Sequence, residues 1–339
     1  MRAGVQYGPR DVRVEDVPEP PTGPDEIKVK IAYCGVCGTD PEIYEGDFGL
    51  MKTEGWPKGP KIEGHEASGM IVELGSAVQQ GYAVGQRVAM NFRSSCGACY
   101  YCRNRMEHFC EHVSIASGAF AEYAVYKESC IYALPDHVSM EEGALLEPVS
   151  VAVHATDLAD IQPGRSVAIL GAGTIGLLMV QLALRAGAAR VLVSEPVAEK
   201  RALALSFGAD VAVDPRTEDV LAAGLELTDG RGFGTVIEAS GSLGVAQQAV
   251  GMADKCGTVL WMAVYPDEAT IPINPFHLYA NELTIRSVNV SPYAFPRSVQ
   301  LLPKLQLQPL ITEIRPLAEL PKVLATFRKS GSIKTLIRP

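Results

Sequence analysis

The stretch Val167-Ala168-Ile169-Leu170-Gly171-Ala172-Gly173-Thr174-Ile175-Gly176 is an apolar run that ends in three spaced glycines. A second apolar run covers residues 177–184. This order predicts a buried strand, a tight turn and a helix. In such a turn the first glycine permits the sharp bend, the second lets the backbone approach a pyrophosphate, and the third lets the helix lie close to the strand. The candidate phosphate-binding residues at this helix N-terminus are therefore Gly171, Gly173, Thr174, Ile175 and Gly176.

An acidic residue further along the chain supports a dinucleotide site. The next apolar strand, 191–194, ends at Glu195, about 20 residues after the glycines, where this kind of unit places its ribose partner. An alternative is a membrane span, because residues 166–184 carry no charge. The glycine-dense turn and the flanking Arg165 and Arg185 favour a buried parallel strand and a buried helix instead. The sequence therefore predicts a dinucleotide cofactor.

The composition is that of a globular enzyme of about two domains. The chain has 339 residues, of which 47% are hydrophobic and 20% are charged. Its start is polar and charged and lacks the apolar stretch of a secretory signal, so we expect a cytoplasmic protein. A net charge of -9 disfavours binding to nucleic acid or to an anionic membrane, because both need a local surplus of Lys and Arg. Small molecules are the expected partners.

Four of the eight cysteines have the spacing of a structural metal site. Cys96, Cys99, Cys102 and Cys110 lie in one short segment, and four thiolates form a closed tetrahedral zinc site that holds its loop folded. An iron–sulfur cluster also uses four cysteines, but its usual spacings differ. In a chain without an export signal, metal-bound thiolates are more expected than disulfides. We therefore predict a structural zinc ion here.

A second set of metal-ligand types lies earlier in the chain. Cys37 follows Cys34 at a Cys-x-x-Cys spacing, and Gly64-His65-Glu66 comes later. Taken alone, the two cysteines could be a redox pair, and a His-Glu dipeptide is usually a surface feature. A metal site with few protein ligands keeps a position open for substrate. The occurrence of both motifs in one chain with a cofactor-binding pattern favours a catalytic metal.

The sequence pattern divides the chain into three parts. Residues 1–150 contain short strands separated by Gly and Pro, and we expect a mostly β domain there. Residues 151–286 alternate helices with apolar strands. The six candidate strands are as many as a doubly wound parallel sheet needs. Residues 287–339 contain helical segments and a closing strand at 334–337, which we expect to return to the first domain. The predicted fold class is α/β.

Several motifs together resemble those of the zinc-dependent medium-chain dehydrogenase/reductase family, the alcohol dehydrogenase superfamily, and within it the sorbitol (polyol) and threonine dehydrogenase branch. The resemblance runs the whole length of the chain. The motifs are Cys37-Gly38-Thr39-Asp40, Gly64-His65-Glu66, the four-cysteine segment, Gly118-Ala119-Phe120-Ala121-Glu122-Tyr123, Glu147-Pro148, the glycine turn and Val236-Ile237-Glu238-Ala239-Ser240-Gly241. The resemblance implies a GroES-like β catalytic domain plus a doubly wound Rossmann domain, with zinc facing the nicotinamide.

The resemblance also implies a catalytic zinc site. Cys37 and His65 would ligate the metal with Glu66 beside them, and Glu147 would be the fourth ligand or bind through water, where simple alcohol dehydrogenases have a cysteine. Which of the two glutamates ligates zinc directly stays open. Glu147 could instead be an N-cap or a surface carboxylate, but it lies in an apolar run, where a carboxylate needs a partner.

The same resemblance implies roles for two residues that follow Cys37 in the sequence. Thr39 would supply the hydroxyl of a proton relay, and Asp40 would orient His65. The chemistry would be the interconversion of a secondary alcohol and its ketone, in which zinc lowers the pKa of the bound hydroxyl and hydride passes to the nicotinamide.

The cofactor is expected to be NAD. An acidic Glu195 accepts both ribose hydroxyls and would repel the 2'-phosphate of NADP. In the resembling families a basic residue at the position of Lys200 lies near the adenosine ribose, which fits an NAD site. Val264 and Asn289 are expected to contact the cofactor as well.

Several departures from the motifs of the branch bear on the substrate. Threonine dehydrogenases have a histidine where Pro41-Glu42 stands here, and sorbitol dehydrogenases have an arginine that the stretch 288–293 lacks. The segment 47–63 looks longer, and the segment 110–120 shorter, than is usual in the branch, which suggests a polyol, cyclitol or sugar-type hydroxyl. An L-threonine 3-dehydrogenase-like enzyme and a non-catalytic cofactor-binding relative remain alternatives. The branch is often tetrameric through the edge of the cofactor sheet, so we expect a homo-oligomer, a tetramer or a dimer.

Overall fold

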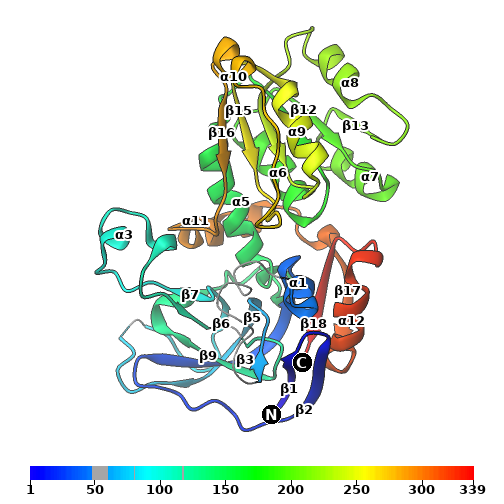
Figure 1. The fold of residues 1–339 in the computed structure, drawn as a ribbon. Coiled ribbons are helices and arrows are strands. Elements are labelled where there is room, and N and C mark those ends of the chain that lie inside the picture. Colours follow the sequence, from blue (N-terminus) through cyan, green and yellow to red (C-terminus); the bar gives the residue numbers. More distant parts are fainter. Residues whose placement is uncertain (48–59, 80, 117) are drawn as a thin grey trace. The chain divides into compact units, whose positions relative to one another are not determined.

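The computed structural model describes residues 1–47, 60–79, 81–116 and 118–339 (Figure 1). The chain forms two compact units, one made of Met1–Ser150 with Pro292–Pro339 and the other of Val151–Ser291. Most of the segment 47–63, which we expect to be longer than usual, lies outside the described part of the chain. Residue 117 of the segment 110–120 lies outside it as well.

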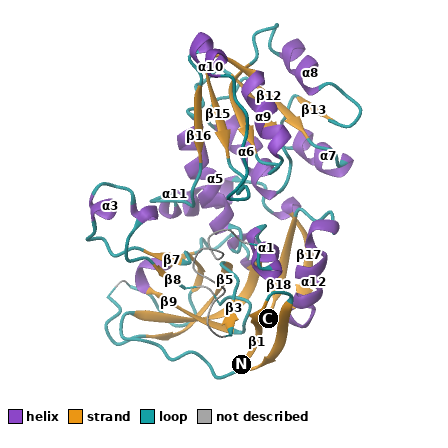
Figure 2. Ribbon diagram, viewed as in Figure 1, coloured by secondary structure: helices purple, strands orange, loops and turns teal. Residues whose placement is uncertain are grey.

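The first unit is built mainly from short strands (Figure 2). Its strands are β1 (Arg2–Gly8), β2 (Asp11–Asp16), β3 (Glu26–Gly35), β4 (Lys61–Ile62), β5 (Glu66–Leu74), β6 (Arg87–Met90), β7 (Arg93–Ser94), β8 (Ser114–Ile115), β9 (Tyr123–Lys127), β10 (Ile131–Ala133), β17 (Ile311–Pro316) and β18 (Lys334–Arg338). Its short helices are α1 (Thr39–Glu45), α3 (Tyr100–Arg103), α4 (Met140–Gly143), α11 (Phe295–Leu301) and α12 (Leu320–Thr326). The predicted β character of this part is confirmed.

Strand β3 organises the main sheet of this unit. Its residues alternate, so that Ile27, Val29 and Ile31 are buried while Lys28 and Lys30 face the other side. It pairs with β5, β9 and β18 in a sheet of order β10-β6-β5-β3-β18-β17. The last strand of the chain thus completes a sheet that begins near residue 26, and the C-terminal segment is part of the first unit.

The second unit is a six-stranded parallel sheet of order β13-β12-β11-β14-β15-β16, flanked by helices (Figure 2). The strands are β11 (Ser166–Leu170), β12 (Arg190–Ser194), β13 (Val211–Val213), β14 (Phe233–Glu238), β15 (Ala253–Trp261) and β16 (Thr284–Ser287). The helices are α6 (Thr174–Arg185), α7 (Ala198–Ser206), α8 (Val220–Leu227), α9 (Leu243–Met252) and α10 (Pro275–Asn281), together with the part of α5 (Leu146–Ala159) from Val151 onward, the first turn of α5 belonging to the first unit. The order confirms the doubly wound sheet, with its switch point between β11 and β14.

Burial explains the uncharged run that begins at Ser166. Strand β11 and helix α6 are both almost fully enclosed, and residues from Val167 to Ile169 and from Leu177 to Val180 have no exposed surface. A strand covered on both faces has a continuous apolar sequence rather than an alternating one. Among the described residues, no helix combines the length and the apolar character needed to cross a membrane.

The glycine turn has the geometry that its sequence predicts. Gly171 has φ of +105°, in the left-handed region, and a Cβ there would lie 2.8 Å from the backbone nitrogen of Ser240. A Cβ on Gly176 would lie 1.9 Å from the carbonyl oxygen of Gly171, whereas one on Gly173 would meet nothing within 4 Å. Gly171 and Gly176 therefore serve the packing of strand and helix, while Gly173 leaves space above the turn.

Alanine substitutions should separate these roles. We expect Gly176→Ala to lower the free energy of unfolding by about 2 kcal/mol, because the new methyl group overlaps backbone that cannot move away cheaply. Gly173→Ala, its control in the same turn, should change stability by less than about 0.5 kcal/mol. Urea unfolding measures both values, and equal stabilities would show that the turn accommodates the methyl group without strain.

Candidate metal centre and cofactor site

Three predicted ligands meet in the first unit. One ligand atom from each of Cys37, His65 and Glu66 lies within 4.8 Å of the other two. Strand pairing explains the meeting, because Gly35 near the end of β3 is opposite Glu66 at the start of β5. The turns that leave β3 and enter β5 are therefore neighbours, although some 30 residues separate them in the sequence.

Asp40 lies behind His65, as expected. It is 2% exposed, and one of its carboxylate oxygens accepts the backbone N–H of Cys37 at 2.7 Å. The other, Oδ1, lies 3.7 Å from Nδ1 of His65, which is the distance of an ion pair rather than of a hydrogen bond, and has no hydrogen-bond partner in the described part of the chain. Burial raises the pKa of Asp40 to about 6, although the nearby His65 acts to lower it. Thr39 is half-buried at the start of α1.

Glu147 lies near this group but outside its tight core. It lies in the first turn of α5 and is only 6% exposed, so it is a buried carboxylate and not a surface one. Burial raises its pKa to about 7, His65 lowers it, and the negative charges of Glu66 and Asp40 raise it further. Glu147 is thus a desolvated carboxylate beside His65.

Lys334 is a member of this centre that the motifs do not include. Its Nζ donates to both carboxylate oxygens of Glu66, at 2.9 and 2.6 Å, and to the carbonyl oxygen of Val36 at 3.0 Å. The two side chains are 4% and 2% exposed. Lys334 is the first residue of a strand whose next three residues are also buried, and a buried ammonium needs an acidic partner, but the local sequence does not identify Glu66 as that partner.

The charges of this centre favour a bound cation. Asp40, Glu66 and Glu147 are three buried carboxylates, and the thiol of Cys37 adds a further anionic ligand when ionised. Lys334 compensates one of these charges. A divalent zinc ion, for which Cys, His and carboxylate are ordinary ligands, would compensate the others. The donor set therefore fits the metal that the motifs imply.

The second predicted metal site is also assembled. The sulfur atoms of Cys96, Cys99, Cys102 and Cys110 lie within 4.8 Å of one another, in the segment between β7 and β8 that contains α3 (Figure 1). Two of the sulfur–sulfur distances are 4.0 Å, close to the edge of a tetrahedron with Zn–S bonds of about 2.3 Å. Backbone N–H groups of Ala98 and Cys99 donate to the sulfur of Cys96. The four thiols therefore fit a closed structural zinc site.

In the second unit, Glu195 and the glycine turn are in direct contact. The pairing of Leu170 with Ser194 sets the ends of β11 and β12 side by side. Glu195 is 6% exposed, and its carboxylate accepts the N–H of Ala172 at 2.8 Å and that of Val197 at 3.0 Å. The acid thus lies at the carboxyl edge of the sheet with both oxygens already hydrogen-bonded.

Basic residues surround this acid more closely than the sequence indicates. Arg201 donates to the carbonyl oxygen of Glu195 at 2.7 Å and lies 3.2 Å from Asp214. Arg216 bonds to Asp214 as well and holds the pKa of that carboxyl well below its usual range. Lys200 is half-buried in α7. Arg216 has no motif that marks it, because it lies about 20 residues after Glu195, beyond the next strand.

Val264 and Asn289 occupy loops of the second unit. Val264 follows β15 and is 61% exposed, and Asn289 follows β16 and is exposed. Both loops leave the carboxyl ends of parallel strands, the edge at which such sheets bind their ligands.

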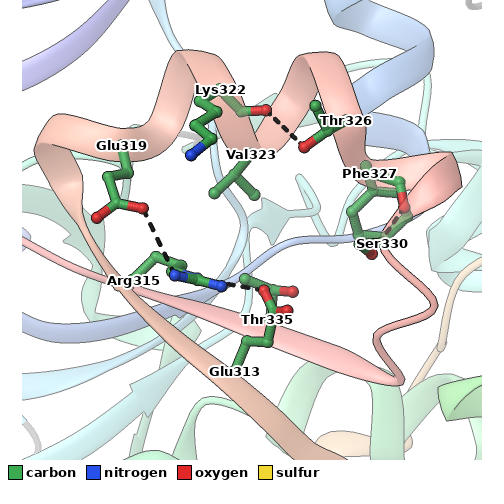
Figure 3. A pocket seen from close by; sticks show the side chains of 9 residues that line it. All are labelled: Glu313, Arg315, Glu319, Lys322, Val323, Thr326, Phe327, Ser330 and Thr335. Atoms are coloured by element: carbon green, nitrogen blue, oxygen red, sulfur yellow. Dashed lines mark hydrogen bonds and ion pairs between the residues drawn. The ribbon is translucent and has the colours of Figure 1, made fainter.

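The first unit also contains a pocket beside strand β18. It has a volume of about 150 Å³ and is lined by residues of β17, β18, α12 and the turn that follows α12 (Figure 3). Arg315 in its wall pairs with Glu313 at 3.3 Å and with Glu319 at 3.7 Å. None of the candidate ligands lines this pocket.

Breaking the buried ion pair should be costly. We expect Lys334→Met to lower the free energy of unfolding by about 3–5 kcal/mol, because Glu66 would keep a buried charge without a partner. Lys127→Met in β9, whose ion pair with Asp25 is exposed, should cost less than about 1 kcal/mol. Adding Glu66→Gln to Lys334→Met should restore much of the loss. Urea unfolding of these variants tests the assignment, which an equal effect of the two lysine substitutions would contradict.

Comparison with known proteins agrees with this arrangement. Residues 23–136 match the alcohol dehydrogenase GroES-like domain, and residues 174–304 match the zinc-binding dehydrogenase domain. The chain is 36% identical to L-threonine 3-dehydrogenase of Pyrococcus horikoshii, with 92% of this chain and 89% of that protein covered. It is 30% identical to sorbitol dehydrogenase of Bacillus subtilis, with 89% and 86% covered.

A solved structure has the same fold over the whole chain. It is that of a protein from Sinorhizobium meliloti described as a zinc-binding dehydrogenase bound to NADP, with a TM-score of 0.94, 33% identity, and 100% of this chain and 99% of that chain covered. The predicted resemblance and the predicted GroES-like and Rossmann architecture are confirmed. The chain belongs to the zinc-dependent medium-chain dehydrogenases/reductases and is an alcohol oxidoreductase of that family.

Proposed function

We propose that this enzyme interconverts a secondary alcohol of polyol, cyclitol or sugar type with its ketone, using zinc and NAD. The observation that carries the proposal is the buried group of Cys37, His65 and Glu66, with Glu147 beside it, in a chain that also contains a dinucleotide-type sheet. Zinc would supply the acidity that makes the substrate hydroxyl easier to deprotonate, and NAD would supply the hydride acceptor.

We assign the catalytic zinc to Cys37, His65 and Glu147, with Glu66 next to it. Glu66 already has both carboxylate oxygens bound by Lys334, whereas Glu147 has no such partner for its carboxylate in the described chain. A carboxylate whose oxygens are not bound by a lysine is the better metal ligand. A carboxylate that a lysine already binds is better suited to act on the metal from a distance, through its charge. We assign the structural zinc to Cys96, Cys99, Cys102 and Cys110.

Residues around the ligands would orient them and move the proton. Asp40 holds the backbone of Cys37 and lies beside the ring nitrogen of His65, so it would fix both ligands together. We assign the hydroxyl of Thr39, two residues after Cys37 at the start of α1, to relay the proton that the substrate releases, taking it up while passing its own proton on toward the cofactor ribose.

For the cofactor we propose NAD. Glu195 is a buried carboxylate at the end of β12, where a 2'-phosphate would meet its negative charge. The neighbouring Arg201 and Arg216 are engaged by Asp214, which reduces what they could offer to a phosphate. The NADP in the related Sinorhizobium meliloti structure makes this preference worth a direct test. The residues assigned to NAD are Gly171, Gly173, Thr174, Ile175, Gly176, Glu195, Lys200, Val264 and Asn289.

The relatives support two substrate classes. The sorbitol dehydrogenase of Bacillus subtilis supports a polyol, and the L-threonine 3-dehydrogenase of Pyrococcus horikoshii supports threonine. We favour the polyol because Pro41-Glu42 stands where threonine dehydrogenases have a histidine. L-Threonine is the second candidate.

We also propose that the enzyme is a cytoplasmic homo-oligomer, a dimer or a tetramer. None of the eight cysteines, each within the described residues, forms a disulfide, as a reducing compartment would require. Strand β16 ends the six-stranded sheet and pairs only with β15 there, and the adjacent helix α10 exposes Phe276 (71%) and Tyr279 (80%). An unpaired strand edge beside exposed aromatic rings suits association with a second copy.

The reaction can be tested with two cysteine variants. Wild-type enzyme should reduce NAD with secondary polyols faster than with L-threonine or primary alcohols, and a zinc chelator should abolish the activity. Cys37→Ser should lower kcat at least 1000-fold while NADH still binds, because the substitution removes a ligand but leaves the second unit intact. Cys256→Ser, the control in neither metal group, should keep full activity. No turnover with any alcohol would support the non-catalytic alternative, and faster turnover of L-threonine would favour that substrate.

Cofactor choice can be tested at Glu195. We expect Glu195→Ala to move the ratio of kcat/KM for NAD to that for NADP at least tenfold toward NADP, because the charge that opposes a 2'-phosphate is removed. Glu199→Ala, an exposed acid in the first turn of α7, is the control and should leave the ratio unchanged. A wild-type preference for NADP, or an unchanged ratio in Glu195→Ala, would contradict the assignment.

A further inference from the structure

Glu238 is a buried carboxylate that the proposed reaction does not use. It ends strand β14 and has no exposed surface. One oxygen, Oε1, accepts the backbone N–H of Ser240 at 2.7 Å, the N–H of Gly241 at 3.0 Å and the hydroxyl of Ser240. The other, Oε2, accepts the hydroxyl of Tyr265. A buried carboxylate is stable only when its oxygens are hydrogen-bonded, and no ion pair of Glu238 is found among the described residues.

These bonds join two loops at the carboxyl edge of the sheet. The loop 239–241 follows β14 and packs on the glycine turn, since Ala239 donates to the carbonyl oxygen of Leu170 at 2.8 Å. The segment 262–265 follows β15 and carries Val264. Because β11 and β14 form the switch point of the sheet, both loops border the crevice in which such sheets bind dinucleotides.

Tyr265 anchors an otherwise irregular connection. Residues 262–274, between β15 and α10, contain no helix or strand. Near its start, the ring of Tyr265 packs edge-on against Trp261 with centroids 6.5 Å apart, and Trp261 in turn donates to the carbonyl oxygen of Ala246 at 3.2 Å. Burial, together with the bond to Glu238, raises the pKa of Tyr265, so its hydroxyl stays a proton donor. Val264, one residue earlier, is left exposed.

We propose that Tyr265 is a positioning residue whose hydrogen bond to Glu238 fixes the segment 262–265 so that it can hold the nicotinamide half of the cofactor. This inference rests on the proposed dinucleotide function. The adenosine half would be held elsewhere, by Glu195 and the glycine turn, which make no hydrogen bond to Tyr265, and the loop 239–241 keeps its own bonds to Oε1 of Glu238 when the hydroxyl of Tyr265 is removed. Loss of the bond should therefore weaken the binding of one half of the cofactor and spare the other.

Tyr265→Phe tests this with two ligands. Titration of the purified protein should show NADH binding weakened about tenfold, because the segment 262–265 is no longer fixed, while ADP-ribose, which lacks the nicotinamide, binds as in the wild type. The KM for NAD should rise by a similar factor. Tyr7→Phe, which removes the hydrogen bond that an exposed tyrosine of β1 donates to Glu15 in the first unit, is the matched control and should behave as the wild type in both titrations.

The outcomes are distinguishable. Unchanged NADH binding in Tyr265→Phe would overturn the inference, and so would an equal loss of NADH and ADP-ribose binding, since that result indicates a general structural role. Wild-type protein that binds neither ligand would overturn the proposed function, and the positioning role with it.

Discussion

The buried contact between Lys334 and Glu66 is the interaction on which the first unit depends. It connects residues 268 positions apart, at a place where both side chains are almost completely enclosed. Strand β18 enters the sheet beside β3, and its first residue reaches the metal centre at the start of β5. The C-terminal strand therefore completes the sheet and, at the same time, supplies the only charge compensation that Glu66 has among the described residues. This one contact therefore affects both the stability of the first unit and the geometry of the metal centre.

The same contact bears on the choice between the two glutamates. Three carboxylates lie buried around one imidazole, and a single ammonium compensates one of them. Burial raises the pKa of Glu147 to about 7, the negative charges of Glu66 and Asp40 act in the same direction, and His65 and Lys334 act to lower it. A divalent cation would change this balance, because its charge favours the ionised form of every ligand around it. Glu66 is held by the protein's own lysine, and we therefore propose that Glu147 is the glutamate that binds the metal.

Much of the fold could be predicted from the sequence because its signals are local. The glycine turn, the apolar strands of the parallel sheet and the four clustered cysteines each lie within a short segment, so spacing alone indicates their structure. Lys334, Arg216 and Tyr265 could not be predicted in this way. Each acts through a partner that only the folded chain brings near, and each lies in a segment whose local pattern indicates no more than a strand or a loop.

The claim that both metal groups hold zinc can be tested most directly by anomalous scattering at the zinc absorption edge from crystals of the purified protein. The account predicts two peaks per chain, one among the sulfur atoms of Cys96, Cys99, Cys102 and Cys110, and one between Cys37, His65 and Glu147. A peak at the four cysteines alone, from protein that oxidises alcohols at its full rate, would contradict it.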